Sequence, residues 1–427
     1  MNKTRVFQRS LLAVAVAVTT SQAHAAGFQL NAQSATGIGR AFAGDAVIAD
    51  NASSMARNPA TMALFDKTSL SLGFETIITD ISVKDSAAPS IYPDYDDVGG
   101  TSVAPNIHLI VPVNEKFAWG VNAYSNFGTN TDFSDSPEYN NSLFGGETDI
   151  LSMNIGLAGS YRLNEQWSFG AGLDVIYGKG TLRRGNNEAK ALAVAGGVQA
   201  GLPIEAAIAA ANQAFPGNDF INVQDAEGWG VGFNIGTVYE LNENNRFGLA
   251  YRYSPEIEAE DDRGQKITLP LPDMVEFSGY HRIQDTKFAA HYSVQWIGWS
   301  AFDTVEFENL QGQGMNPSGS YESVYDWQDG WRFAIGGTYY LSDAWTLRAG
   351  YMHDTSAQDE VTSISVPDSD RNWFSGGFTY HFNEDQNLDF GFTYLVGSDT
   401  DVLDQGILSA TTRADAILVG LQYSHQF

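Results

Sequence analysis

The chain has 427 residues, a formal net charge of −28 and no cysteine. This strongly acidic character excludes nucleic-acid binding through phosphate contacts, and the lack of cysteine excludes disulfides and thiolate metal ligands. After residue 25, no apolar run reaches the roughly 20 residues that a transmembrane helix needs.

Residues 1–25 have the organisation of a secretory signal peptide. A basic start that includes Lys3 and Arg9 precedes an apolar stretch at 11–18, and small residues surround a cleavage site after Ala25. The apolar stretch is too short to cross a bilayer. We therefore expect the protein to be exported and residues 1–25 to be removed.

Residues 26–66 do not alternate as a strand would. The segment is rich in glycine, alanine, serine and asparagine, and it carries Asn58, Pro59 and Ala60 near its end. Because a membrane barrel is expected from residue 67 onward, we predict that 26–66 folds inside it as a plug, or hatch.

The chain from 67 to 427 repeats the alternation of a transmembrane β-barrel. In the last segment, Ile417, Val419 and Leu421 share one face, and Gly420 and Gln422 share the other. Apolar residues toward lipid and polar or small residues toward the lumen produce this period of two.

Six short polar turns with flanking aromatic residues separate many of these strands. Asparagine and aspartate favour tight turns, and an aromatic girdle beside short turns is typical of the periplasmic interface. With both chain ends in the periplasm, six such turns predict an all-β, closed antiparallel barrel of 14 strands. The turns lie at 113–116, 163–166, 241–245, 283–286, 341–344 and 382–386; the strands are predicted at 67–79, 102–113, 116–128, 147–163, 166–183, 228–241, 244–258, 273–283, 286–308, 330–341, 345–357, 370–382, 387–399 and 413–427.

Two outer loops carry apolar residues that suit a surface groove. In the loop at 184–227, apolar residues recur at helical spacing over 204–215. One interpretation is a helix that packs on the loop cap for stability, and the other is one wall of an apolar groove for a hydrophobic ligand. The loop at 129–146 would form the other wall. The candidate groove residues are Phe133, Leu143, Phe144, Ile204, Ile208 and Phe215.

An ordered set of motifs resembles the FadL-type family of outer-membrane transporters of long-chain fatty acids and other hydrophobic compounds. Four segments resemble the family's hatch, and Tyr124 to Gly128 resembles its strand-kink sequence. The hatch-like segments are 26–30, 37–41, 49–52 and 57–60, and further similar segments are 161–170, 300–302 and 366–371.

The resemblance implies a barrel of the same strand number, occluded by the hatch. Substrate would enter an outer groove, reach a lumenal pocket, trigger a hatch movement and leave sideways into the membrane where the third strand kinks inward. The Asn-Pro-Ala unit is expected to lie near that kink and to brace it. The hatch and lateral-gate residues are Asn58, Pro59, Ala60, Ser125, Asn126 and Gly128.

The resemblance also assigns ligand-binding roles. Phe28 would lie at the lumenal pocket, with a plain plug anchor as the alternative, and Arg184 would pair with a carboxylate headgroup, with a lumenal ion pair as the alternative. Gln328 stands where family members carry a pocket lysine, and Arg332 or Lys179 is expected to compensate. The ligand is therefore a fatty acid or a less charged hydrophobic molecule.

We predict a passive, hatch-gated transporter, with an uptake channel for aromatic or other hydrocarbons as the alternative and a barrel enzyme or adhesin as more distant ones. No Ser/His/acid set stands out for catalysis, no cofactor or metal is expected, and the acidic run at 256–262 is interpreted as a solvated loop in preference to a calcium site. Expected partners are the hydrophobic ligand, outer-membrane lipid and the barrel-assembly machinery, whose insertion signal the terminal Phe427 resembles. A monomer is expected.

Overall fold

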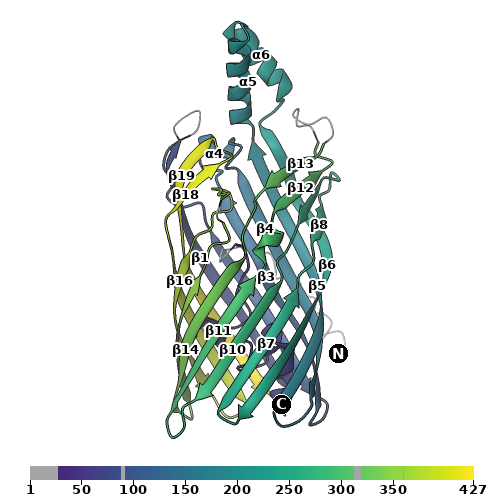
Figure 1. Ribbon diagram of the computed structural model, residues 1–427, viewed down its shortest axis with the longest axis vertical. Helices are drawn as coiled ribbons and strands as arrows, with labels where there is room; N and C mark the ends of the chain where they lie inside the picture. The colour runs from purple at the N-terminus through teal and green to yellow at the C-terminus, as the bar shows by residue number, and fades with distance from the viewer. Residues whose placement is uncertain (1–26, 88–91, 312–318, 359) are drawn as a thin grey trace, which may run out of the picture.

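Fourteen antiparallel strands close into a barrel in the computed structural model (Figure 1), which describes residues 27–87, 92–311, 319–358 and 360–427. The predicted signal peptide lies outside these residues. β1 pairs with β19 from Ser69↔Gln426 outward, and this pairing closes the sheet. The wall strands are β1 Ser69–Ala87, β2 Thr101–Pro112, β3 Phe117–Asp132, β4 Glu147–Arg162, β5 Trp167–Gly185, β6 Asp219–Asn242, β7 Asn245–Tyr253, β10 Met274–Arg282, β11 Phe288–Ile297, β14 Gly330–Ser342, β15 Trp345–Asp354, β16 Arg371–His381, β17 Gln386–Gly397 and β19 Leu408–Gln426.

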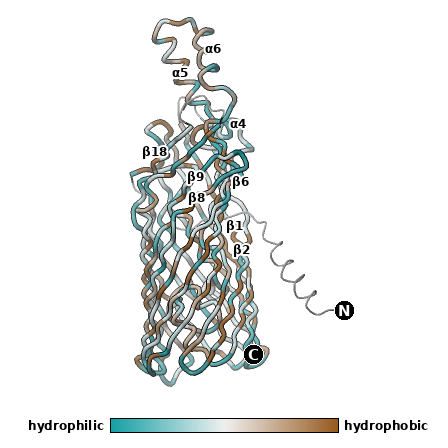
Figure 2. Tube along the Cα trace, turned by 90° about the vertical axis from the view of Figure 1, so that its right-hand side faces the viewer, coloured by the Kyte–Doolittle hydropathy of each residue, from teal (hydrophilic) through white to brown (hydrophobic). Residues whose placement is uncertain are grey.

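The outer end of the barrel is extended by short strands and helices. The additional elements are β8 Ile257–Glu260, β9 Lys266–Leu269, β12 Thr304–Glu308, β13 Tyr321–Val324, β18 Thr400–Asp404, α4 Pro137–Asn140, α5 Asn187–Gln199, α6 Ile204–Ala214 and the 3₁₀ turn η2 Trp299–Ala301. α5 and α6 form a hairpin that rises above the barrel (Figures 1 and 2). Among the described helices, none is long and apolar enough to cross a membrane.

The predicted strand number and all six predicted turns are confirmed. The turns join β2 to β3, β4 to β5, β6 to β7, β10 to β11, β14 to β15 and β16 to β17. Asn164 shows why they form: its side-chain oxygen accepts hydrogen bonds from the backbone amides of Gln166 at 2.9 Å and Trp167 at 2.8 Å.

Several predicted strand ends differ from the structure at the outer side. β1 continues to Ala87 and β6 begins at Asp219, because the outer loops prolong the ladder beyond the membrane. The strand predicted at 244–258 ends at Tyr253, just before Pro255, which has no amide donor. The strand predicted at 286–308 breaks at the η2 turn before β12 resumes.

Side chains of the wall alternate between lipid and lumen as the sequence predicts. On β5, Leu173 is 62% exposed, whereas its neighbour Asp174 is fully buried inside the barrel. Figure 2 shows apolar and polar residues interspersed along the strands. The wall is therefore apolar outside and largely polar or small inside, as a bilayer requires.

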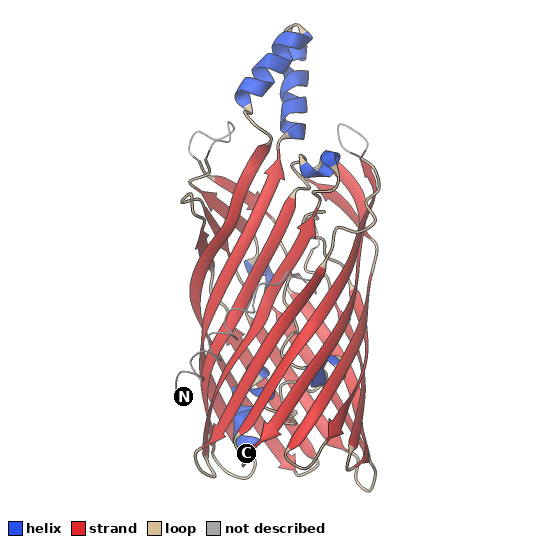
Figure 3. Cartoon of the chain, turned by 180° about the vertical axis from the view of Figure 1, so that it is seen from behind, coloured by secondary structure: helices blue, strands red, loops and turns tan. Residues whose placement is uncertain are grey.

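The first described residues fold inside the barrel, and we call residues 27–66 the plug. It contains α2 Ala35–Ile38, α3 Ser54–Arg57 and the 3₁₀ helix η1 Pro59–Leu64, which are visible within the barrel in Figure 3. Ser34 caps α2 by accepting from the Gly37 amide at 2.9 Å, and Asn58 caps η1 by accepting from the Ala60 amide at 3.0 Å. A plug inside the barrel confirms the predicted architecture.

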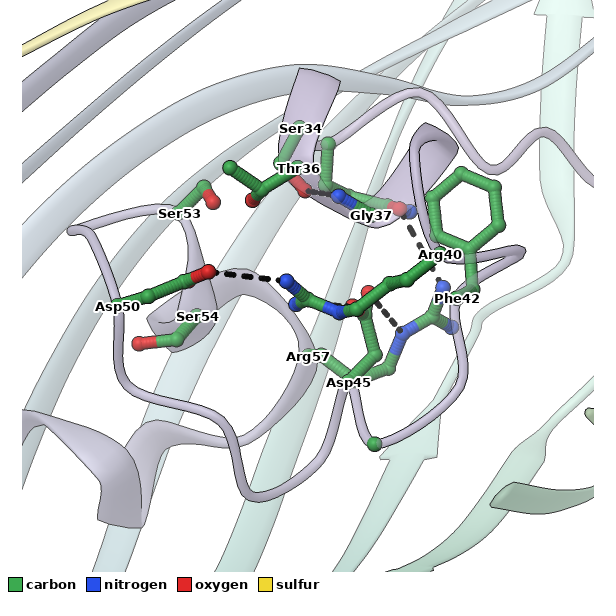
Figure 4. Close-up of polar contacts among 12 residues, drawn as sticks. Ser34, Thr36, Gly37, Arg40, Phe42, Asp45, Asp50, Ser53, Ser54 and Arg57 are labelled. Atoms are coloured by element: carbon green, nitrogen blue, oxygen red, sulfur yellow. Dashed lines mark hydrogen bonds and ion pairs between the residues drawn. The ribbon is translucent and has the colours of Figure 1, made fainter. Parts of the chain in front are cut away.

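Ion pairs hold the middle of the plug together (Figure 4). Arg40 pairs with Asp45 at 2.7 Å and with Asp50 at 3.0 Å. Arg40 and Asp45 are buried and Asp50 is partly buried, and a buried charge left unpaired would cost several kcal/mol.

Two ion pairs join this middle part to the wall. Arg57 reaches Glu276 on β10 at 3.3 Å, and Asp50 reaches Arg348 on β15 at 3.2 Å. Because both partners of each pair are at least partly buried, we expect the middle of the plug to stay fixed relative to these strands.

The plug also touches the wall where glycine leaves room for it. A Cβ atom on Gly236 of β6 would overlap the side-chain oxygen of Asn58, and a Cβ atom on Gly170 of β5 would overlap the backbone of Pro59 and Ala60. The absence of a side chain at these two positions allows the plug to approach the strands directly.

We predict that Gly236→Ala destabilises the plugged barrel by about 1–3 kcal/mol, because the new methyl group must displace Asn58. Thermal unfolding of the detergent-solubilised protein, followed by its heat-dependent mobility on denaturing gels, measures the loss. Gly159→Ala is the matched control, since the nearest atom to a Cβ there is 4.0 Å away. Equal unfolding temperatures for the two variants would contradict the prediction.

Candidate functional site

A cavity of about 480 Å³ lies among the outer loops at the mouth of the barrel. Its walls come from the β3–β4 loop, the outer ends of β5 and β6, the β12–β13 hairpin and the loops at 360–365 and 403–406. The apolar lining residues are Leu143, Phe144, Leu182, Phe220, Ile221, Phe307, Tyr321, Val324, Tyr325, Val361 and Leu403. Leu143 and Phe144 thus line a cavity, as the groove interpretation expected.

Arg184 is the one basic residue among the described residues that line this outer cavity. It is buried, and its guanidinium donates to the carbonyls of Glu147 at 2.8 Å and Arg183 at 2.9 Å and to the Thr148 hydroxyl at 2.8 Å. These bonds fix the guanidinium at the cavity edge and use part of its donor capacity.

Asp404, at the end of β18, lines the same cavity. Burial raises the pKa of this carboxyl to about 6, although a hydrogen bond from Ser363 and the charge of Arg184 oppose the increase. The outer cavity therefore holds a carboxyl group that changes charge close to neutral pH, beside its one arginine.

Glu188, at the start of α5, organises the wall that carries Leu143. Its carboxylate accepts from the Leu143 amide at 2.7 Å, from the Ser142 hydroxyl at 2.9 Å and from the Tyr92 hydroxyl. Burial and the Glu188 carboxylate both raise the pKa of Tyr92. The sequence analysis missed this residue, because its three partners come from two other loops.

The α5–α6 hairpin does not form the second wall of the groove, so that part of the prediction is wrong. Ile204 and Ile208 are 57% and 45% exposed on α6, and neither they nor Phe215 lines the outer cavity. Phe133 instead packs against Tyr139, with ring centroids 5.2 Å apart. The helical spacing correctly predicted α6, but the packing against α5 turns only Ala207 and Ala211 inward.

Phe28, near the start of the plug, is fully buried in a cluster of aromatic rings below the outer cavity. Its ring centroid lies 4.7 Å from Trp299, 5.1 Å from Phe302 and 5.9 Å from Trp327. Phe302 in turn lies 4.8 Å from Tyr325, which lines the outer cavity. Aromatic and aliphatic side chains thus connect the outer cavity to Phe28 without interruption.

Arg332 lies beside this aromatic cluster and holds the plug. Its guanidinium donates to the side-chain and backbone oxygens of Gln29, the latter at 3.3 Å, and pairs with Asp354 at 3.1 Å. It is therefore close to the lumenal pocket predicted for the ligand, but its donors are engaged by the plug and by β15.

Two predicted ligand residues point elsewhere. Lys179 faces outward from β5 and pairs with Asp225 at 2.7 Å, because odd-numbered residues of this strand face away from the lumen. Gln328 is exposed, and its amide donates to the Ser356 carbonyl at 3.4 Å, while the adjacent Trp327 turns inward. The prediction that these two side chains serve the lumenal pocket is wrong.

The ladder between β2 and β3 is interrupted, and we call the interrupted stretch the window. Their ladder runs from Pro112↔Ala118 to Ile107↔Ala123 and ends there within the described residues, although both strands continue outward. The Asp132 amide donates to the Val98 carbonyl at 3.1 Å, so the two segments meet again farther out.

A β-bulge in β3 produces this window. The β3–β4 register shifts between Ser125 and Gly128, and the burial alternation of β3 is lost from Tyr124 to Thr129. The extra residue turns Phe127 into the lumen, where its ring lies 6.1 Å from Phe28. Ser125, Asn126 and Gly128 therefore lie where the sequence analysis placed a strand kink.

The start of the plug pairs with β3 beside the window. The Leu30 amide donates to the Asn126 carbonyl at 2.8 Å, and the Gly128 amide donates to the Phe28 carbonyl at 2.8 Å. Residues 28–30 thus satisfy backbone groups at the bulge. We call residues 27–33 the plug edge.

The Asn-Pro-Ala unit does not brace the kink, contrary to the prediction. The Asn58 amide donates to the Thr237 carbonyl of β6 at 3.1 Å and to the Ala46 carbonyl of the plug at 2.7 Å. Pro59 and Ala60 lie against Gly170 of β5. The polar side chain of Asn58 reaches β6 because Gly236 leaves space for it.

Below the plug lies a second cavity of about 480 Å³, which is lined by many charged side chains. It opens among the periplasmic ends of β10, β14, β15, β16 and β17. Its charged or titratable lining residues are Asp50, Arg282, Lys287, Asp343, Arg348, His381 and Asp389. The lower cavity thus has more charged or ionisable side chains than the outer cavity, where Arg184, Glu322, Glu360 and Asp404 are the charged ones.

Comparison with known proteins places these features in a family context. The family model "Outer membrane protein transport protein (OMPP1/FadL/TodX)" matches residues 16–427. The long-chain fatty acid transport protein of Salmonella typhi is 35% identical over 452 residues, with 100% of both chains covered. The structure of a Pseudomonas aeruginosa FadL homologue aligns with a TM-score of 0.78 at 20% identity, covering 94% of this chain and all of that one. The Pseudomonas putida toluene transporter TodX aligns with a TM-score of 0.67 at 18% identity, covering 94% and 100%.

We predict that acidification stabilises the loop that carries Asp404. The pKa of this carboxyl is higher in the folded protein, about 6, than its ordinary value of 3.8, so the folded state binds the proton more tightly. Loop stability should therefore fall as the pH rises from about 4 to about 6 and stay low above that.

Amide hydrogen exchange of residues 400–410, corrected for the intrinsic pH dependence, measures this change. Asp404→Asn should give high protection at both pH 5 and pH 7.5, because the neutral amide carries no charge to desolvate. A wild-type loop with the same corrected protection at both pH values would contradict the prediction.

Proposed function

Because the chain belongs to the OMPP1/FadL/TodX family of outer membrane transport proteins and takes up hydrophobic compounds, we propose that its substrates are long-chain fatty acids. In this proposal the substrate enters the outer cavity, moves to the aromatic cluster around Phe28 and leaves sideways through the window between β2 and β3. The observation that carries the proposal is the contrast between the apolar upper lumen and the charged lower lumen.

The upper lumen suits an acyl chain. Moving a methylene group from apolar surroundings into water costs about 0.8 kcal/mol, so roughly 12 kcal/mol for a tail of about 15 methylenes. The side chains between the outer cavity and Phe28 would keep such a tail out of water. Below Phe28, the ion pairs of the plug and the polar lower cavity offer no comparable surroundings.

The window offers the substrate an exit route that avoids the charged lower lumen. It lies beside Phe127 and the plug edge, and its outer side faces the membrane. We propose that a substrate tail displaces Phe28 from the aromatic cluster, which withdraws residues 28–30 from β3 and opens the window. The plug edge would move while the ion pairs of Arg40 and Arg57 keep the rest of the plug in place.

Arg184 is proposed to hold the carboxylate headgroup at the outer cavity, because the N–H donors of its guanidinium can bind both oxygens of a carboxylate. Its existing bonds to Glu147, Arg183 and Thr148 would orient it. Neutral hydrocarbons are the second candidate substrates, and one observation favours them: Glu322, Glu360 and Asp404 also line the outer cavity and disfavour an anion.

Further parts of the proposal concern the whole chain. We propose that residues 1–25 are removed, that 26–66 act as the plug and 67–427 as the barrel, and that the protein acts as a monomer surrounded by outer-membrane lipid. The barrel-assembly machinery would recognise the last strand, which ends at Phe427 and closes the sheet against β1.

We predict that Arg184→Ala weakens carboxylate ligands more than neutral ones, by about 10- to 150-fold, the worth of one charge-assisted hydrogen bond. Binding of oleate and of oleyl alcohol to the purified protein, measured by calorimetry, gives the two affinities. Lys179→Ala is the control, because Lys179 faces away from the lumen and pairs with Asp225. Equal losses for both ligands would remove the headgroup role of Arg184.

We predict that closing the window blocks uptake. We introduce cysteines at Ala104 on β2 and Asn126 on β3 and bridge them with a short bis-maleimide. Fatty-acid uptake by the bridged protein should fall to the background rate. The same variant without the linker provides the reference rate, so that the effect of the bridge is measured apart from the effect of the two substitutions. Full uptake by the bridged protein would rule out the sideways route while leaving outer-membrane uptake itself intact.

A further inference from the structure

Arg184 and Asp404 line the same outer cavity, and neither is spent on the other. Arg184 is 6% exposed and Asp404 is 8% exposed. The guanidinium donates to the backbone and to Thr148, whereas the side-chain hydrogen bond of Asp404 comes from Ser363. The charge of Arg184 still acts on the Asp404 carboxyl, so the two groups lie within electrostatic reach. The cavity therefore holds a cation and a carboxyl that attract each other without a direct hydrogen bond.

The surroundings of Asp404 supply little other positive charge. Its cross-strand partner on β19 is Leu408, which is uncharged, and Asp401 on its own strand is exposed. The other charged or titratable residues that line the cavity are Arg184 on β5, Tyr321, Glu322 and Tyr325 on β13, and Glu360 in the loop at 360–365. Glu322 and Glu360 are exposed, so Asp404 is the buried carboxyl among the described lining residues.

A carboxylate headgroup that enters this cavity brings a second negative charge close to Asp404. Two carboxylates in one site cannot both stay ionised without strong repulsion, so the pair keeps one proton to a higher pH than either group alone. An O–H of one carboxyl that donates to the oxygen of the other forms a short, charge-assisted hydrogen bond. The single charge that remains suits one arginine.

We propose that Asp404 and the headgroup of a fatty acid share one proton in the outer cavity, while Arg184 binds the remaining negative charge. This inference rests on the proposed function, in which the outer cavity receives the carboxylate. The proton comes from the solvent when the substrate binds, and no covalent bond of the chain changes. Asp404 thereby becomes a binding group for the carboxyl headgroup, although its own charge would otherwise repel that headgroup.

Proton sharing makes the affinity for a fatty acid depend on pH. Above pH 6 the free cavity has lost the proton of Asp404, whose pKa is about 6, so binding of a carboxylate must take a proton up again. Affinity for the carboxylate is therefore highest below pH 6 and falls as the pH rises. A fatty alcohol can donate to an ionised Asp404 or accept from a protonated one, so its affinity should stay nearly constant.

The experiment measures binding of oleate and of oleyl alcohol to the purified full-length protein by calorimetry. Measurements at pH 7 in two buffers of different ionisation enthalpy count the protons, and oleate should bind with uptake of about one proton. The affinity for oleate should fall about 10- to 50-fold between pH 6 and pH 8, and that for oleyl alcohol by less than about 2-fold.

Asp404→Asn should abolish the proton uptake and reduce the pH dependence for oleate to less than about 2-fold, because the amide does not titrate. The same variant corrects for any protonation of oleate itself. Glu322→Gln is the matched control, since Glu322 is an exposed carboxylate of the same cavity, and it should bind oleate with the proton uptake of the wild type.

Oleate binding by the wild type without proton uptake would overturn the inference, and this measurement needs no variant. Uptake that persists in Asp404→Asn, or that is lost in Glu322→Gln, would also overturn it. An equal fall in affinity for oleate and oleyl alcohol would indicate a change in the loop alone, with the same consequence. Failure of the proposed headgroup site is distinguishable, because oleate would then bind Arg184→Ala as tightly as the wild type.

Discussion

Pairing of every backbone polar group in the hydrocarbon layer is the constraint on which the rest of this structure depends. An unpaired amide or carbonyl in lipid costs several kcal/mol, so a membrane sheet must close on itself. β1 and β19 provide that closure with a long continuous ladder. The β2–β3 junction is the exception among the described neighbouring strands, since its ladder stops at Ile107 and Ala123 while both strands continue. The plug edge compensates by binding the bulged part of β3.

This arrangement gives one segment two roles. Residues 28–30 complete the hydrogen bonding of β3, and Phe28 fills the aromatic cluster at the end of the apolar lumen. A ligand that competes for the place of Phe28 therefore acts directly on the segment that covers the window. No long-range coupling is needed, because Phe28 takes part in both: its carbonyl bonds β3 and its ring fills the cluster.

Electrostatics divides the plug into a fixed part and an edge. Arg40, Arg57 and Arg348 bind three carboxylates around the middle of the plug, and removing one partner of a buried pair costs several kcal/mol. The edge is held by hydrogen bonds between neutral groups and by hydrogen bonds from Arg332 and Arg57, each worth less than a buried ion pair. Movement is therefore expected at the edge, next to the window, and not in the part that separates the outer cavity from the periplasm.

The features that depend on short-range patterns could be predicted from the amino-acid sequence. Alternation and the Asn-rich turns predicted the closed barrel and its strand number, and the lack of alternation before residue 67 predicted the plug, because the period of a strand and the geometry of a turn are local. The same alternation would have placed Lys179 outside and Arg184 inside, since the two have opposite parity on β5. Only the tertiary structure decided that Phe127 turns inward, that Asn58 binds β6 and that α6 points away from the outer cavity. Those outcomes depend on one bulge, on glycines in distant strands and on how a closed sheet brings together residues that are a hundred or more positions apart.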